Sequence, residues 1–303
     1  MYYRKLGKTA AACVSLLAVS CGRGVEQSAA EEAEANARPP SSGSEVIRSL
    51  FESLPPIQQA LLGGTATWLL TLIGATPVLF INTVNRRLMD GMMGAAAGIM
   101  VAASCWSLLI PAIDLGGVGR ALVGLGLGAA FIWWLDKIIP HLHAEFPDEA
   151  SPEGPHVTWR RSALLMSAIT IHNIPEGLAV GMGFGSGDLG RAIALAVGIG
   201  LQNIPEGLAI ALPLRRDGMS RFKALWYGQL SAVVEPIAAV AGVLAIGIGA
   251  AVLPYGLAFA AGAMLYVVVE ELLPETTRSG NVDIATLGFI VGFALMMALD
   301  QLA

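Results

Sequence analysis

The chain contains one seven-residue phrase, Asn-Ile-Pro-Glu-Gly-Leu-Ala, twice, at 173–179 and again at 203–209. His172 precedes the first copy and Gln202 precedes the second, so each copy brings together side chains that can bind a metal ion. Each copy also lies inside an apolar stretch that is long enough to cross a bilayer. Because a carboxylate in the middle of a membrane is costly, an intramembrane glutamate indicates a functional site by default.

The spacing within each copy predicts a shared helix face. His172 and Glu176 are four residues apart, which places them one turn apart on the same face, and Gln202 and Glu206 repeat this geometry. The asparagine that opens each copy lies on the adjacent edge of that face. The proline of each copy leaves one backbone carbonyl without its helical partner, an arrangement tolerated in a membrane where it lines a polar cavity or is buried in protein. Two such kinked helices predict a cation site.

Composition places these helices in a polytopic membrane protein of the all-α class. The 303 residues are 55% hydrophobic and 14% charged, with a mean hydropathy of +0.65. Abundant glycine is typical of transmembrane helices that pack through small residues. A net charge of −5 argues against nucleic acid as a partner, and three cysteines form no disulfide framework.

Eight membrane spans are expected from the hydropathy, and the basic residues orient them. A cytoplasmic first loop places ten Lys and Arg residues of the short loops inside and only Arg120 and Arg191 outside. Both termini are then extracytoplasmic. The expected spans are 57–82, 89–111, 118–139, 162–184, 191–214, 223–249, 252–273 and 282–302.

Three parts are expected along the chain. Residues 1–21 have a basic start and a short apolar run ending at Cys21, which is typical of a bacterial secretion signal with lipoprotein-type cleavage; a mis-assigned start or an unstructured tail is the alternative. Residues 22–56 form a flexible acidic tail. Residues 57–303 form the membrane domain.

Other polar residues in the spans extend the predicted site. Glu235, followed by a proline, is a third membrane-embedded carboxylate; a protonated glutamate, or one bonded to a freed carbonyl, is the alternative. Met100 lies at mid-depth, where packing is the usual role of methionine. Ser107 and Asp114 lie toward the outer end of span two, where Asp114 is an entrance ligand or a helix-end carboxylate.

Several candidates lie toward the cytoplasmic side. The loop after span three contains His141 and His143, which either bind a transition metal weakly or are solvated. Adjacent glutamates near the end of span seven favour an exit role. The cytoplasmic candidates are Asp136, His141, His143, Glu270 and Glu271.

Enzyme motifs are not found: the sequence has no His-Glu-x-x-His, P-loop or Gly-x-Ser-x-Gly pattern. No ATP-binding domain is present either, so transport would depend on a gradient. We therefore expect a transporter rather than an enzyme, with no organic cofactor.

The repeated His/Gln-Asn-Ile-Pro-Glu-Gly pattern on the fourth and fifth of eight spans resembles the signature of the ZIP (Zrt/Irt-like protein) family, over about 57–303. The resemblance implies import of divalent metals, chiefly zinc, and a fold in which the first three and last three helices are inverted repeats around the middle pair. It also implies an elevator-like motion and a bacterial inner-membrane location. Members of this family often form dimers, which makes a homodimer an expectation for this chain.

The resemblance further implies a binuclear metal site midway across the membrane, with both phrase glutamates bridging. Some bacterial relatives have aspartate where this chain has Asn203, and a neutral amide should weaken binding at the second position. Glu270 stands where some relatives have histidine. The implied ligands of the first position are Met100, His172, Glu176, Gln202 and Glu206, and those of the second are Asn173, Glu176, Asn203, Glu206 and Glu235.

The mixture of imidazole, thioether, amide and carboxylate suits Zn²⁺, Cd²⁺, Fe²⁺ or Mn²⁺ better than Ca²⁺ or Mg²⁺, which prefer oxygen ligands alone. Two other functions remain to be weighed. A Ca²⁺ or other cation antiporter also uses paired Glu and Pro, but would rarely use His172 or Met100. An intramembrane zinc enzyme would need an activated water and an open path for its substrate.

Overall fold

The computed structural model describes residues 49, 51–140 and 161–303. The chain separates into two compact units, Met1–Leu54 and Pro55–Ala303, and the second unit carries the helices described below. The predicted signal at 1–21, nearly all of the predicted tail, and both His141 and His143 lie outside the described residues. Their assignments therefore stay predictions.

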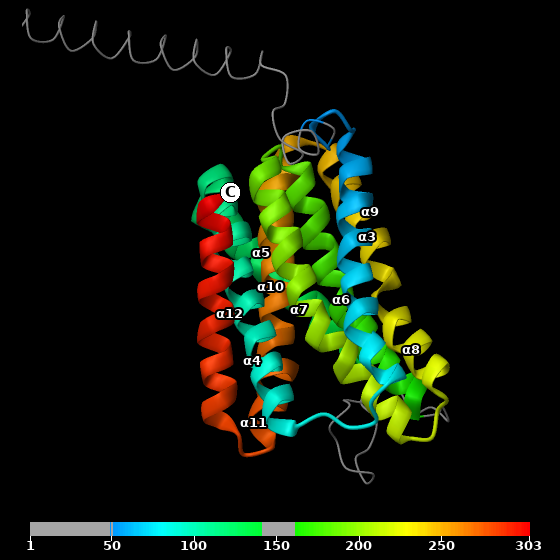
Figure 1. Ribbon diagram of the computed structural model, residues 1–303. Coiled ribbons are helices and arrows are strands. Elements are labelled where there is room, and N and C mark those ends of the chain that lie inside the picture. The colour runs from blue at the N-terminus through cyan, green and yellow to red at the C-terminus, as the bar shows by residue number, and fades with distance from the viewer. Residues whose placement is uncertain (1–48, 50, 141–160) are drawn as a thin grey trace, which may run out of the picture. The chain divides into compact units, whose positions relative to one another are not determined.

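Every regular element that the structure describes in Pro55–Ala303 is a helix, as the sequence predicts (Figure 1). Elements η1, η3 and η4 are short 3₁₀ turns, whereas η2 and η5 are π-helical. The elements are α3 (Pro56–Ala75), η1 (Thr76–Leu79), α4 (Arg86–Ala102), η2 (Ala103–Leu109), α5 (Ile110–Ile138), α6 (Arg161–Gly185), α7 (Leu189–Arg216), α8 (Arg221–Leu230), η3 (Ser231–Val233), α9 (Val234–Gly247), η4 (Ala250–Val252), α10 (Leu253–Val267), η5 (Val268–Leu272), α11 (Leu273–Arg278) and α12 (Val282–Leu302).

Polar side chains cap the helices and satisfy their own backbone. The Asn85 side chain accepts a hydrogen bond from the Arg87 N–H at the start of α4, and Asp188 accepts one from the Arg191 N–H at the start of α7. Within the apolar helices, hydroxyl groups donate to the carbonyl one turn earlier, as Thr170 does to Met166 at 2.7 Å. Such local pairing lets polar residues lie in apolar helices without an unsatisfied donor.

Six helical segments of the described chain are long and apolar enough to cross a membrane. One of them, Arg86–Ile138, runs for 53 residues through α4, η2 and all of α5. Gly117 interrupts it with φ 77° and ψ 162°, a backbone conformation that glycine adopts without steric cost. The loop expected between 111 and 118 is therefore wrong in detail, because helix continues through Pro111 and the chain turns only at Gly117. At the other end of the chain, α12 coincides with the expected span 282–302.

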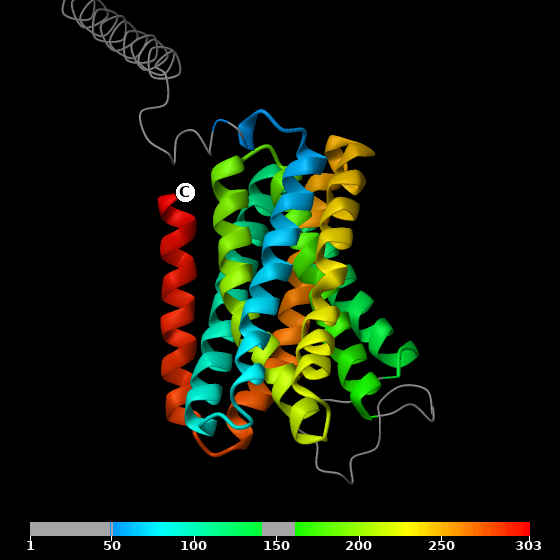
Figure 2. The ribbon, with the colours of Figure 1, turned by 45° about the vertical axis from the view of Figure 1, so that its right-hand side comes forward.

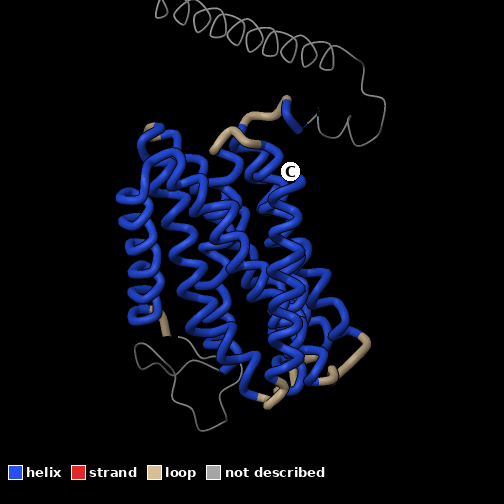
Figure 3. Tube along the Cα trace, turned by 90° about the vertical axis from the view of Figure 1, so that its left-hand side faces the viewer, coloured by secondary structure: helices blue, strands red, loops and turns tan. Residues whose placement is uncertain are grey.

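The helices fall into two groups by their packing. In the first group α3 packs against α7, and α6 packs against α9; in the second, α4 packs against α12, and α5 against α10. Contacts of α4 with α7 and of α10 with α6 join the groups. Figure 2 shows α12 at the edge of the bundle beside α4. The loops gather at the two ends of the helices (Figure 3), and the start of α3 and the end of α12 lie at the same end (Figure 1).

Glycines in the repeated phrase bring the helices into backbone contact. A Cβ at Gly177 on α6 would lie 2.5 Å from the Glu235 carbonyl oxygen of α9. A Cβ at Gly207 on α7 would overlap the Thr71 carbonyl oxygen of α3. Each copy of the phrase thus fixes its glutamate next to a helix from a distant part of the chain.

Candidate metal-binding centre

The two copies of the phrase lie side by side on neighbouring helices. His172, Asn173 and Glu176 are on α6, and their counterparts Gln202, Asn203 and Glu206 are on α7, which packs against α6. Five of these six side chains are buried, and His172 is partly exposed. Both helices remain α-helical through the prolines of the phrase. The face predicted from the four-residue spacing is therefore present in both helices.

Acceptor oxygens in this centre are buried without a donor. Within the described residues, neither carboxylate oxygen of Glu176 has a hydrogen-bond partner, and the same holds for Asn173 Oδ1 and Gln202 Oε1. Gln202 lies next to Glu176, but its amide nitrogen is turned to Asn203, to which it donates at 2.7 Å. A buried acceptor left unsatisfied costs about 1–3 kcal/mol. A cation bound among these oxygens would remove that cost.

Carboxylates crowd the same region. Glu176 and Glu206 lie close enough to each other to repel electrostatically, and Glu235 and Glu271 add to this repulsion. Among the described residues, no Lys or Arg forms an ion pair with Glu176, Glu206 or Glu235. Like charges held together in a low-dielectric interior are compensated by a nearby cation or by protonation of a carboxylate. The electrostatics of the centre are those of a cation site.

Glu235 is the best-satisfied carboxylate of the cluster. The Asn203 Nδ2 donates to both of its carboxylate oxygens, at 3.0 Å each, and also contacts the Thr67 carbonyl oxygen at 3.2 Å. Thr67 was not among the residues expected at the site. The sequence does contain a pattern that points to Thr67, since Thr67 and Thr71 are polar residues one turn apart in an apolar helix. The structure shows that both are buried.

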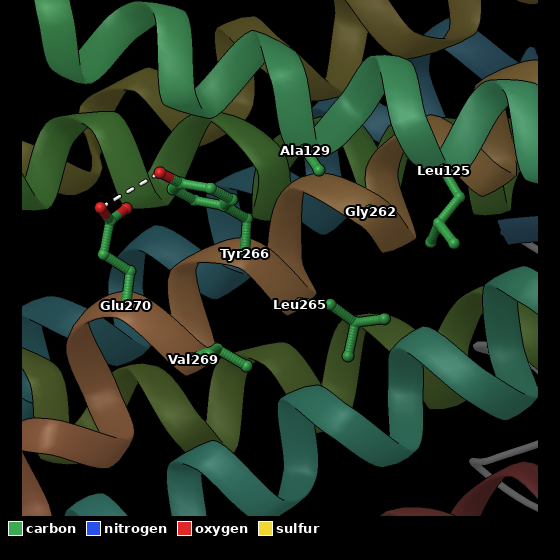
Figure 4. A pocket seen from close by; sticks show the side chains of 7 residues that line it. All are labelled: Leu125, Ala129, Gly262, Leu265, Tyr266, Val269 and Glu270. Atoms are coloured by element: carbon green, nitrogen blue, oxygen red, sulfur yellow. Dashed lines mark hydrogen bonds between the residues drawn. The ribbon is translucent and has the colours of Figure 1, made fainter.

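Glu271, expected to have an exit role, contacts a residue of the repeated phrase. Its carboxylate contacts the His172 Nε2 directly, so it belongs with the phrase residues. The neighbouring Glu270 faces a different side: it is exposed and accepts a hydrogen bond from the Tyr266 hydroxyl at 3.1 Å (Figure 4). Glu270 lines an apolar groove of about 360 Å³ between α5 and α10. Neighbouring positions on a helix point roughly a quarter turn apart, so the adjacent glutamates of η5 face two separate surfaces.

The expected entrance residues meet at the end of the bundle where α12 ends. Ser107 on η2 is buried and donates to Asp300 at 2.7 Å. Ser107 also lines a cleft of about 220 Å³ together with the exposed Asp114, Asp188 and Arg191. Asp300, near the end of α12, is therefore the partner of Ser107.

The remaining candidates are less closely tied to the centre. Met100 is fully buried on α4, which packs against α7, and Asp136 is buried near the end of α5. Within the described residues, no three His, Cys, Asp or Glu side chains converge as a ready metal site. The ligand atoms available beside Glu176 are instead the amide oxygens of Asn173 and Gln202.

Comparison with known proteins decides the family. A sequence model of the ZIP zinc transporter family matches residues 155–300. The chain is 41% identical to zinc transporter ZIP11 of Homo sapiens, an alignment that covers 80% of this chain and 96% of the relative. The chain belongs to the ZIP family. The resemblance carried by the repeated phrase is therefore confirmed.

Bacterial members of the ZIP family are similar over the same part of the chain. Zinc transporter GufA of Myxococcus xanthus is 41% identical, with 80% of this chain and 96% of the relative covered. Zinc transporter ZIPB of Bordetella bronchiseptica is 40% identical, with 80% of each chain covered. ZIP proteins are transport proteins and not enzymes, which agrees with the expectation drawn from the motifs.

Proposed function

We propose that this ZIP protein imports divalent transition metals, zinc foremost, across the cytoplasmic membrane of a bacterium. The observation that carries the proposal is the group of buried acceptor oxygens of Glu176, Asn173 and Gln202 that have no donor. The three relatives described above are zinc transporters, which supports zinc as the substrate. Cd²⁺, Fe²⁺ and Mn²⁺ fit the same mixed donor set.

The proposed centre combines both helices of the repeated phrase with α4 and α9. His172 supplies an imidazole nitrogen, the glutamates supply charge, and moderate affinity follows from the neutral amides, which lets the ion leave. Glu271, through its contact with His172, joins the path on the cytoplasmic side. The proposed residues of the centre are Met100, His172, Asn173, Glu176, Gln202, Asn203, Glu206 and Glu235.

The proposed topology has eight spans within 57–303. Arg86–Ile138 counts as two of them, because a bilayer core is crossed by about 20 residues and Gly117 breaks the helix. Helix α6 is a further span. Most of the basic residues lie at the end of the bundle where α4 begins and α7 ends. By the positive-inside rule this supports a cytoplasmic position for that end and an extracytoplasmic position for both termini.

The packing supports alternating access between the two groups of helices. If α3 corresponds to α8–α9, α4 to α10–α11 and α5 to α12, the contact of α3 with α7 maps onto that of α9 with α6. The contact of α4 with α12 likewise maps onto that of α10 with α5. This exchange is the pattern of an inverted repeat around the middle pair. We propose that the first group of helices, which contains α3, α6, α7 and α9, moves as a block against the second group. We also propose that the protein is a homodimer.

Radioactive zinc uptake by proteoliposomes that contain the full-length protein tests this function. We expect the parental protein to accumulate zinc, and a His172→Ala/Glu176→Ala variant to accumulate none above empty vesicles. Arms with and without a pH gradient report whether protons drive uptake, and an arm with excess Ca²⁺ reports selectivity. Uptake by the double variant at the parental rate would refute the proposed centre, and inhibition by Ca²⁺ would favour a hard-cation exchanger.

The two adjacent glutamates of η5 provide a sharper test of the path. We expect Glu271→Gln to reduce zinc uptake by about 10–100-fold, the usual effect of losing a group that holds a metal ligand. Glu270→Gln should leave uptake within about twofold of the parent, because the structure turns that side chain to the outer groove (Figure 4). The measurement is the initial rate at subsaturating zinc. Equal losses in both variants would contradict the separation of the two surfaces.

A further inference from the structure

The Asn203 amide fills the space between three helices of the centre. Its nitrogen lies 3.0 Å from each carboxylate oxygen of Glu235 on α9 and 3.2 Å from the Thr67 carbonyl oxygen on α3. Its oxygen accepts a hydrogen bond of 2.7 Å from Gln202. Asn203 is completely buried, and both its amide nitrogen and its amide oxygen are hydrogen-bonded.

This nitrogen has the position and the partners that a cation would have. A carboxylate and a carbonyl oxygen point at it, and its two hydrogens carry positive density toward them. An amide nitrogen has no free lone pair, so a metal ion could not bind there without displacing it. Turning the amide over would place its oxygen against the Glu235 carboxylate and would give up the bond from Gln202.

The same amide also affects the first metal position, around Glu176, because it fixes the orientation of the Gln202 side chain. Because the Gln202 nitrogen donates to Asn203, the Gln202 oxygen is left without a donor beside Glu176. Glu176 has two such oxygens, whereas Glu235 has its oxygens satisfied. The unsatisfied acceptors of the centre thus belong to Glu176, Gln202 and Asn173, and none belongs to Asn203 or Glu235.

We propose that Asn203 closes the second metal position, so that this carrier binds a single metal ion at the centre. Within the proposed function, on which this inference rests, the ion is held by the first-position ligands around Glu176. Glu235 then acts as a positioning residue that joins α9 to α7 and α3 through the amide. Asn203 takes the place of a second ion permanently.

The number of zinc ions bound per protein tests this proposal. Full-length protein in detergent is dialysed to equilibrium against buffered free Zn²⁺, and bound zinc is counted by mass spectrometry. The count for a Glu176→Ala/Glu206→Ala variant is subtracted to remove sites elsewhere in the chain. We expect a difference of one ion for the parent and of two for Asn203→Asp, whose carboxylate no longer donates to Glu235.

Two control variants show whether the extra ion lies between residues 203 and 235. Gln202→Glu adds the same charge one residue away and should still give one ion. Asn203→Asp/Glu235→Gln removes the partner carboxylate and should return the count from two to one. Size-exclusion elution and thermal unfolding confirm that each variant is folded.

The outcomes separate this inference from the function on which it rests. A difference of two ions in the parent, or an extra ion in Gln202→Glu, would overturn the single-ion proposal while leaving zinc transport intact. A difference of zero in the parent would overturn the proposed centre itself. The parental count decides between one and two ions even if Asn203→Asp fails to fold.

Discussion

Zinc uptake is expected to fall by more than about 100-fold when Glu176 becomes glutamine, beyond what the loss of an outer partner costs in metal sites. The substitution preserves shape but removes the charge whose two oxygens lack any donor in the described structure. The metal-free variant should nevertheless unfold at the same or a higher temperature than the parent, because a charge buried without a partner destabilises the folded state. Initial uptake rates and thermal unfolding in zinc-free detergent solution measure the two effects.

Opposite effects on uptake and stability distinguish a metal ligand from a structural residue. If Glu176 had only a structural role, Glu176→Gln would lower zinc uptake and stability together, since the substitution would disturb the core. Asp217→Asn is the matched control, because Asp217 is an exposed carboxylate in the short connection after α7. Normal uptake by Glu176→Gln would show that the unsatisfied oxygens are not where the ion binds.

The second large effect is expected from Gly207→Ala, which should lower the free energy of unfolding by about 1–3 kcal/mol. A Cβ at this position would collide with the Thr71 carbonyl oxygen and crowd the Ala75 nitrogen 3.0 Å away, both in the backbone of α3. A backbone cannot move aside as a flexible side chain does. Unfolding of the purified protein in mixed detergent micelles measures the change.

Gly126 on α5 supplies the control for this prediction. A Cβ there would have no atom within 4 Å, so Gly126→Ala should be neutral or stabilising by up to about 1 kcal/mol from helix propensity. Zinc uptake should follow the same order, because Gly207 positions the helix of Glu206. If the two variants unfold alike, the close contact of α7 with α3 does not contribute to stability.

Much of this protein could be predicted from one sequence because the relevant signals are local. Hydropathy depends on consecutive residues, so the apolar helices and the extent of α12 follow directly. Helical periodicity relates residues three and four apart, which is why the phrase at 173–179 already predicts a shared face. The carboxylates of Glu176 and Glu206 could be predicted to form a cation site because each lies within an apolar stretch long enough to cross a membrane.

Contacts between distant segments depend on tertiary packing and not on local sequence signals. Glu270 and Glu271 are adjacent and chemically identical, and only the position of α6 relative to η5 decides that Glu271 meets His172. Thr67 and Glu235 are joined through Asn203 because α3, α7 and α9 pack together. The sequence by itself determined which residues are apolar, which carboxylates lie in a membrane and which helix face carries the repeated phrase. Only the tertiary structure decided which of those groups are satisfied and which are left for a metal ion, because hydrogen bonding depends on distances between helices that sequence spacing does not specify.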